Sequence, residues 1–278
     1  MEITLPISFN LALKITSGLT VGMSYPTGRI QKGLILLDGG EELCEEAVGF
    51  GVPILKCGLQ SIFPGELELT TLNGNFTRGV HAIFKLNLEE KIAKTGSGTI
   101  NNRILYGSKN ILAASIRRWP FIRGLLTHTS NLLRARLGLV TTYEPADFST
   151  YLSLTYSIDP STGRIKVELD KQDPFPSEIS EVILMNEQGA RHFDQYRDTD
   201  GISVRGKEIG CWDQVTAAEA SFISPRRQIS FSLPQVSGAR LYRGRELIGK
   251  RLAWSGFGYS FPPNLEHFKY VITIKRLT

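Results

Sequence analysis

The chain has 278 residues, of which 41% are hydrophobic and 21% are charged, and its formal net charge is +5. These values are typical of a globular protein, and they exclude a disordered chain or a fibrous repeat. No segment approaches the roughly 18 consecutive apolar residues that a membrane-spanning helix requires. The N-terminus lacks the pattern of a secretory signal, so we expect a cytoplasmic protein.

The N-terminal part of the chain predicts β-strands, because apolar and polar residues alternate there. Asn73-Gly74 lies between two of the alternating segments, and this pair favours a tight hairpin turn. The segments are residues 3–15, 29–40, 66–72 and 76–88.

The middle of the chain has a different pattern. Apolar residues in 108–139 recur near the helical period after a candidate N-cap at Ser108, which predicts a short helical insertion within about 101–140. Between residues 91 and 143 the chain carries Lys and Arg but neither Asp nor Glu. Arg117, Arg118 and Arg123 are therefore candidates for a surface that binds an anionic partner, although an ordinary helix that covers the sheet also fits this pattern.

The C-terminal half gives the clearest strand pattern. Residues 151–158 and 164–169 alternate on either side of Asp159-Pro160-Ser161-Thr162-Gly163, which predicts a hairpin with a loop. Further strands are expected at 181–185, 228–233, 238–242 and 268–277.

These elements predict a mainly β protein, a large antiparallel two-sheet sandwich that forms one domain over residues 1–278. Two β domains, 1–142 and 143–278, or a β-barrel are the alternatives. The number and order of the strands resemble the supersandwich of the galactose-mutarotase-like group, which implies a carbohydrate-active fold. The catalytic His and Glu pattern of that group has no assignable match at His81, His128 or His192.

The sequence predicts neither a metal site nor a cofactor. The four histidines are scattered, no phosphate-binding loop or nucleotide fingerprint occurs, and nucleic acid is not an expected partner. Cys44, Cys57 and Cys211 lack the spacing of a metal or redox motif, so we expect buried thiols that form no disulfide.

Two polar segments are candidates for acid and base chemistry. In the first, His192 is followed by Asp194, and a carboxylate can orient an imidazole for proton transfer. In the second, Asp38, Glu41, Glu42, Glu45 and Glu46 form an acidic cluster that would be catalytic only if its members converged across a cleft. A solvated polar loop is the simpler interpretation of either segment.

Two aromatic segments are candidates for ligand binding. Trp212, Asp213, Trp254 and Tyr259 could line a carbohydrate cleft, because aromatic rings pack against sugar rings while polar groups bind hydroxyls. In residues 254–261, alternation puts Trp254 on one strand face with two glycines, and Tyr259 on the other face, which has a core-like pattern.

Two functional hypotheses follow. The first is a carbohydrate-binding or carbohydrate-processing β-sandwich, and an open sheet face with exposed Trp would favour it. The second is a β-barrel or interaction protein for a lipid or another apolar or anionic ligand, and a closed apolar cavity would favour it. The sequence leaves open whether the chain is an enzyme and which oligomeric state it adopts.

Overall fold

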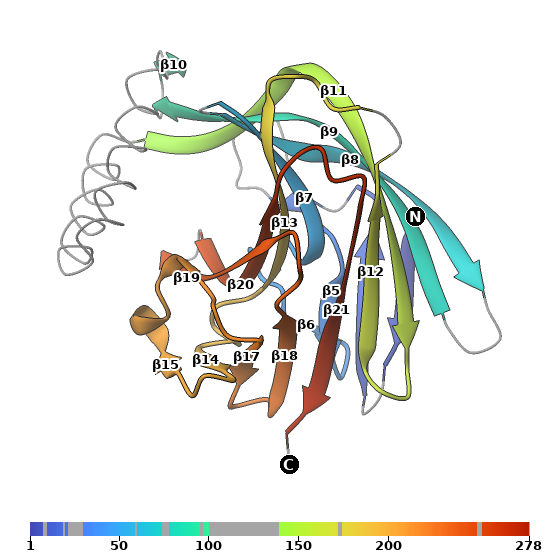
Figure 1. The fold of residues 1–278 in the computed structure, drawn as a ribbon, viewed down its shortest axis with the longest axis vertical. Coiled ribbons are helices and arrows are strands. Elements are labelled where there is room, and N and C mark those ends of the chain that lie inside the picture. The colour runs from blue at the N-terminus through green and yellow to red at the C-terminus, as the bar shows by residue number, and fades with distance from the viewer. Residues whose placement is uncertain are drawn as a thin grey trace.

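The computed structural model of the chain describes residues 1–7, 10–18, 20–21, 30–58, 60–73, 78–94, 97–99, 139–171, 174–248 and 252–277. Within these ranges the protein is nearly all β, and every strand pair is antiparallel. A large curved sheet and a smaller sheet enclose the main core, as Figure 1 shows. The predicted fold class, an antiparallel two-sheet sandwich, is confirmed.

The large sheet contains most of the strands, in the order β15-β14-β17-β18-β21-β12-β11-β9-β8-β7-β13-β20-β19-β16, and β10 pairs with β9. A single 3₁₀ turn within the described residues, η2 (Gly206–Ile209), connects β15 to β16. The strands of this sheet are β7 (Phe50–Cys57), β8 (Gln60–Asn73), β9 (Arg78–Lys94), β10 (Ser97–Thr99), β11 (Leu139–Asp159), β12 (Arg164–Asp170), β13 (Ile179–Gln188), β14 (Gln195–Asp198), β15 (Ser203–Arg205), β16 (Cys211–Gln214), β17 (Glu219–Ser224), β18 (Ile229–Pro234), β19 (Arg240–Ile248), β20 (Leu252–Phe261) and β21 (His267–Arg276).

The smaller sheet has the order β1-β2-β5-β6, and a separate two-stranded ribbon pairs β3 with β4. Leu13 and Ile15 of the smaller sheet are fully buried in the core that the large sheet also contributes to. The strands are β1 (Glu2–Pro6), β2 (Leu11–Thr16), β3 (Thr20–Val21), β4 (Ile30–Gln31), β5 (Ile35–Asp38) and β6 (Glu41–Glu42).

Three long strands lie in the middle of the large sheet and join its two ends. β8, β9 and β11 pair along most of their lengths, and in Figure 1 they pass over the top of the molecule and continue down one side. The inner face of the sheet is mostly apolar, since strand alternation places residues such as Phe84, Leu154 and Val167 in the core.

The predicted C-terminal hairpin is confirmed. β11 and β12 pair in register from Ser153↔Asp170 to Asp159↔Arg164, so both predicted strands are present, and β11 extends one residue into the predicted loop, to Asp159. The Asp159 carboxylate accepts hydrogen bonds from the Ser161 backbone N–H and from the hydroxyls of Ser161 and Thr162, which closes the turn.

The predicted helical insertion lies outside the described residues, except for Leu139, where β11 begins. Arg117, Arg118 and Arg123 also lie outside them. Because β11 crosses the boundary at 142 and 143 and pairs with strands from both parts of the chain, the large sheet joins them. The division into one domain or two stays a prediction.

Candidate aromatic and carboxylate site

The outer face of β13, β20, β19 and β16 carries the aromatic residues that the sequence indicated. We call this surface the aromatic face, and define it by Met185 and Glu187 of β13, Trp254, Gly256 and Gly258 of β20, Tyr242, Gly244 and Glu246 of β19, and Trp212 of β16. Paired strands set its rows, which are Met185↔Gly258↔Tyr242 and Glu187↔Gly256↔Gly244. Residues between these positions point into the core.

Trp212 reaches the aromatic face through a β-bulge. Cys211 pairs with Gly244 but Asp213 pairs with Arg243, so Trp212 is the extra residue of β16, and its φ is 79°. Bulges of this kind redirect a side chain. The indole stacks on Tyr242 with 5.3 Å between ring centroids and 3° between ring planes. Both rings are half-buried, which leaves part of each exposed to solvent.

Glycine makes room for both indoles on this face. A Cβ atom at Gly258 would overlap the outer ring of Trp212, and one at Gly244 would lie 2.6 Å from the outer ring of Trp254. Trp254 also packs on a small cluster of buried apolar side chains, and its indole N–H donates to the Glu246 carboxylate over 3.3 Å. The sheet thus holds two flat aromatic surfaces close to its backbone.

Glu187 is a buried carboxyl group beside these rings. Burial raises its pKa to about 8, the Val48 backbone N–H at 3.5 Å opposes this increase, and the negative charge of Glu246 adds to it. A carboxyl with such a pKa is mostly protonated at neutral pH and can then donate as well as accept a hydrogen bond. The aromatic face therefore combines stacking surfaces with one neutral acid and one carboxylate.

Asp213 and Tyr259 lie away from the aromatic face. Asp213 pairs with Arg243, whose guanidinium lies 4.1 Å from the centre of the Tyr196 ring, and cross-strand partners share a face. Tyr259 has no exposed surface, packs against Phe268 and Tyr270, and donates its hydroxyl to the Pro234 carbonyl. The core-like pattern that alternation gave for Tyr259 agrees with this position.

His192 and Asp194 lie in the connection between β13 and β14. Burial lowers the pKa of His192, and no hydrogen bond joins its ring to the Asp194 carboxylate. The acidic cluster is largely neutralised by cations, since Asp38 pairs with Arg227 and Arg276, Glu42 with Lys14, and Glu45 with Arg191. The two Asp38 pairs join the smaller sheet to the β17–β18 turn and to β21, whereas the pair of Glu42 with Lys14 lies within the smaller sheet.

The cysteines differ in burial more than the sequence suggested. All three are free of disulfides, as expected, but only Cys44 is buried, while Cys57 is half-buried and Cys211 is exposed. Cys211 is exposed because β16 is the edge strand of the large sheet.

In the described part of the chain no three His, Cys, Asp or Glu side chains gather as metal ligands would, and no helix is long and apolar enough to cross a membrane.

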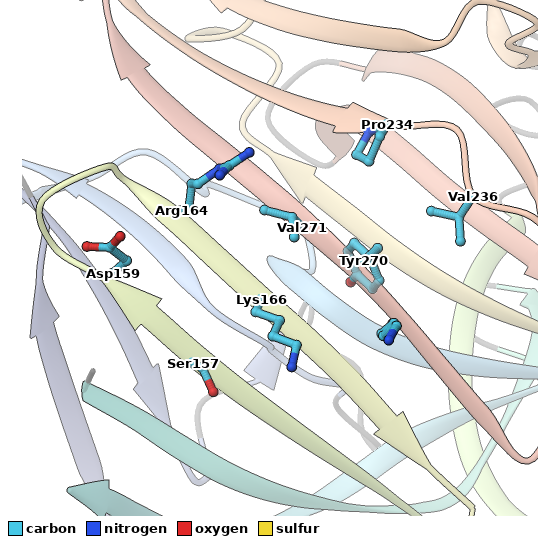
Figure 2. A pocket seen from close by; sticks show the side chains of 9 residues that line it. Ser157, Asp159, Arg164, Lys166, Pro234, Val236, Tyr270 and Val271 are labelled. Atoms are coloured by element: carbon cyan, nitrogen blue, oxygen red, sulfur yellow. The ribbon is translucent and has the colours of Figure 1, made fainter. Parts of the chain in front are cut away.

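A second feature lies on the outer face of β11, β12 and β21. It is a hollow of about 550 Å³ bordered by these strands and by the end of β18, and Figure 2 shows the side chains around it. We call it the cationic groove, because Arg164, Lys166 and Lys269 line it. On the same face His81 is held between two hydroxyls, Ser153 and Thr155, at 3.2 and 3.1 Å.

Sequence patterns missed several of these residues. Tyr242 lies in a segment whose alternation predicted a strand, but alternation does not show which strands become neighbours in the sheet. Glu187 lies two residues beyond the strand predicted at 181–185, and β13 continues to Gln188. Lys269 and Arg164 are 105 positions apart in the sequence, and antiparallel pairing of β12 with β21 brings their strands together. The glycines of β19 and β20 were the one available signal for Trp254.

The geometry defines the class as a large antiparallel β-sandwich. No family model and no curated protein sequence matches the chain. Similar solved structures are those of the α-N-acetylgalactosaminidase NagBb from Bifidobacterium bifidum, as its GalNAc complex and its Gal-NHAc-DNJ complex. Their TM-scores are 0.50 and 0.51, with 10% sequence identity. Each match covers 98% of this chain but 35% of the enzyme, so the chain spans about a third of that protein's length. At this identity the likeness shows the fold alone.

Proposed function

We propose that this chain is a carbohydrate-binding β-sandwich and that the aromatic face is its binding site. The observation that carries the proposal is the stacked pair of Trp212 and Tyr242, which is partly exposed on the same face as the Glu246 carboxylate. Aromatic rings pack on the C–H faces of sugars, and polar groups nearby fix the orientation of the ligand. The sandwich fold is also found in a part of a carbohydrate-processing enzyme.

Each component has a defined role in this proposal. The Trp212 and Tyr242 rings supply the apolar surface, and Trp254 extends it along β20. Glu246 accepts hydrogen bonds from hydroxyl groups, whereas the buried Glu187 carboxyl lies out of reach of a ligand. This set of groups suits a neutral sugar better than an acidic one, because a ligand carboxylate would meet the negative charge of Glu246.

Binding measurements with aromatic variants test this function. A glycan array that includes GalNAc identifies a ligand, and calorimetry then compares the wild type with Trp212→Ala. Loss of the stacked indole removes an aromatic anchor worth about 1–2 kcal/mol, so we expect Kd to rise by roughly tenfold or more. Trp212→Phe retains an aromatic ring and should recover part of the affinity.

Tyr151→Ala serves as the control, because Tyr151 is a half-exposed aromatic residue on β11, outside the aromatic face. It should bind like the wild type, and thermal melting verifies that each variant is folded. If no glycan binds the wild type, or if Trp212→Ala binds as tightly as the wild type, the aromatic face is not a carbohydrate site.

A further inference from the structure

The cationic groove contains more positive charge than its neighbours neutralise. Arg164 and Lys269 make no ion pair with any described residue, and both side chains are exposed. Lys166 pairs with Glu168 over 2.8 Å, yet half of the Lys166 side chain is exposed. Arg164 and Lys269 therefore face the same hollow without a salt bridge, although Asp159 lies opposite Arg164 and Glu168 lies opposite Lys269 in the strand register, so the three cations exceed these two acids by one charge.

The acid at the rim of the groove is already engaged. Asp159 lines the hollow, but its carboxylate accepts one backbone and two hydroxyl hydrogen bonds from Ser161 and Thr162. These hydrogen bonds lower the pKa of Asp159 and hold the carboxylate in the β11–β12 turn. Its negative charge lies opposite Arg164 in the strand register, but the hydrogen bonds of the turn hold the carboxylate, and no ion pair with Arg164 forms, which leaves the guanidinium able to contact a ligand.

The other walls of the groove are apolar or neutral. Pro234 and Val236 border the groove from the end of β18, and Val271 borders it from β21 (Figure 2). Ser157 lies beside Lys166 in the β11–β12 register. The edge of Tyr270 closes the floor, and its hydroxyl is bonded to Asn186 inside the core. The hollow thus offers an apolar surface, one hydroxyl and three cationic side chains from β12 and β21.

We propose that the cationic groove is a second ligand site, and that it binds a sugar carrying an anionic oxygen group, either a carboxylate or a sulfate. The ring of such a ligand packs on Val236 and Val271, its anionic group lies among Arg164, Lys166 and Lys269, and Ser157 binds a hydroxyl. A volume of about 550 Å³ lies within the range of pockets for small ligands. The groove shares no residue with the aromatic face, so this proposal stands independently of the first.

The test compares four probes by calorimetry at low salt and at physiological salt: digalacturonate, galactose 6-sulfate, galactose and inorganic sulfate. We expect binding of one or both acidic sugars and little binding of galactose or free sulfate. Affinity should fall at physiological salt, because exposed charges are screened over about 8 Å there. Digalacturonate and galactose 6-sulfate separate the two sources of the anionic group.

Paired variants assign the binding to the groove. Arg164→Gln with Lys269→Gln should weaken binding of the acidic sugar by about tenfold or more, since it removes the two groove cations that form no salt bridge. Lys275→Gln with Lys207→Gln removes the same net charge from exposed positions that do not line the groove, and should leave binding within about twofold of the wild type. Trp212→Ala should also leave it unchanged, which separates this site from the aromatic face.

Three results would overturn the proposal: no binding of either acidic sugar to the folded wild type, equal losses in the groove variant and its charge-matched control, or sulfate or galactose binding as tightly as the acidic sugars. The last outcome would mean that charge alone or the sugar ring alone accounts for the affinity.

Discussion

The aromatic face and the cationic groove are outer surfaces of the same sandwich, but they are built differently. In the groove, regular alternation in β12 and β21 places Arg164, Lys166 and Lys269 outward while their neighbours fill the core. On the aromatic face, glycines replace outward side chains and a bulge turns Trp212 across β19 and β20. We conclude that charge on a sheet can be supplied by simple strand periodicity, whereas a flat aromatic surface requires irregular backbone and missing side chains.

The largest expected effect tests the role of glycine on the aromatic face. A methyl group at Gly256 would overlap the backbone carbonyl of Asn186, which cannot move without disturbing the pairing of β13. We expect Gly256→Ala to lower the free energy of unfolding by about 3 kcal/mol, as for strongly overpacked sites. Urea denaturation measures this change.

Gly258→Ala is the matched variant, because its methyl group would meet only the outer ring of the half-buried Trp212. It should cost about 1 kcal/mol, displace the indole and weaken glycan binding. Equal destabilisation by the two substitutions would contradict the distinction between a backbone obstacle and a side chain that can move.

A smaller effect, dependent on pH, concerns Glu187. Burial raises its pKa from 4.5 to about 8, so folding favours the protonated form. The stabilisation from the protonated Glu187 carboxyl is complete below the pKa of the unfolded state, and it is lost as the pH rises through the pKa of the folded state. Glu187→Gln mimics the protonated carboxyl. It should therefore be more stable than the wild type at about pH 8, by on the order of a few kcal/mol, with little difference near pH 4.5.

Urea unfolding across this pH range, with Glu208→Gln as an exposed control, measures the difference. Glu208 lies on η2 and its side chain is in solvent, so its variant should follow the wild-type curve. If the curves of Glu187→Gln and the wild type run parallel from acid to weakly alkaline pH, Glu187 ionises normally in the folded protein.

The smallest effect is expected in the cationic groove. The pair of Lys166 and Glu168 is partly exposed, with 50% and 24% of the side chains accessible, and such pairs contribute at most about 1 kcal/mol. Glu168→Gln should change the free energy of unfolding by less than this amount. It should also strengthen binding of an acidic sugar, because Lys166 loses its counterion.

Glu66→Gln is the control for that variant, since it frees Lys85, which lies on β9 and does not line the groove. It removes the same charge without a gain in affinity. A similar gain in both variants would show that net charge, and not the groove, sets the affinity.

The sequence predicted much of the fold because strand signals are local. Alternation identified both strands of the β11–β12 hairpin, half of β13, most of β18 and β21, and the inward position of Tyr259. It gave only part of the site: Trp212 and Trp254 were recognised as candidate aromatic residues, the second because it shares a strand face with two glycines, but Tyr242, Glu187 and the groove cations were not recognised. Glu187 follows a strongly apolar strand segment, and nothing in that segment distinguishes a buried acid from one at a strand end.

The sequence by itself therefore determined the class of fold, the inward and outward residues of its regular strands, and the turn that Asp159 closes. These properties depend on the two-residue period of a strand and on short-range hydrogen bonds. The tertiary structure alone decided the order of strands in the large sheet, the bulge that places Trp212 on Tyr242, and the position of Arg164 and Lys269 along the same groove. Those features arise from pairing between distant segments, and the shift in the pKa of Glu187 arises from burial, which exists only once the sheets have packed.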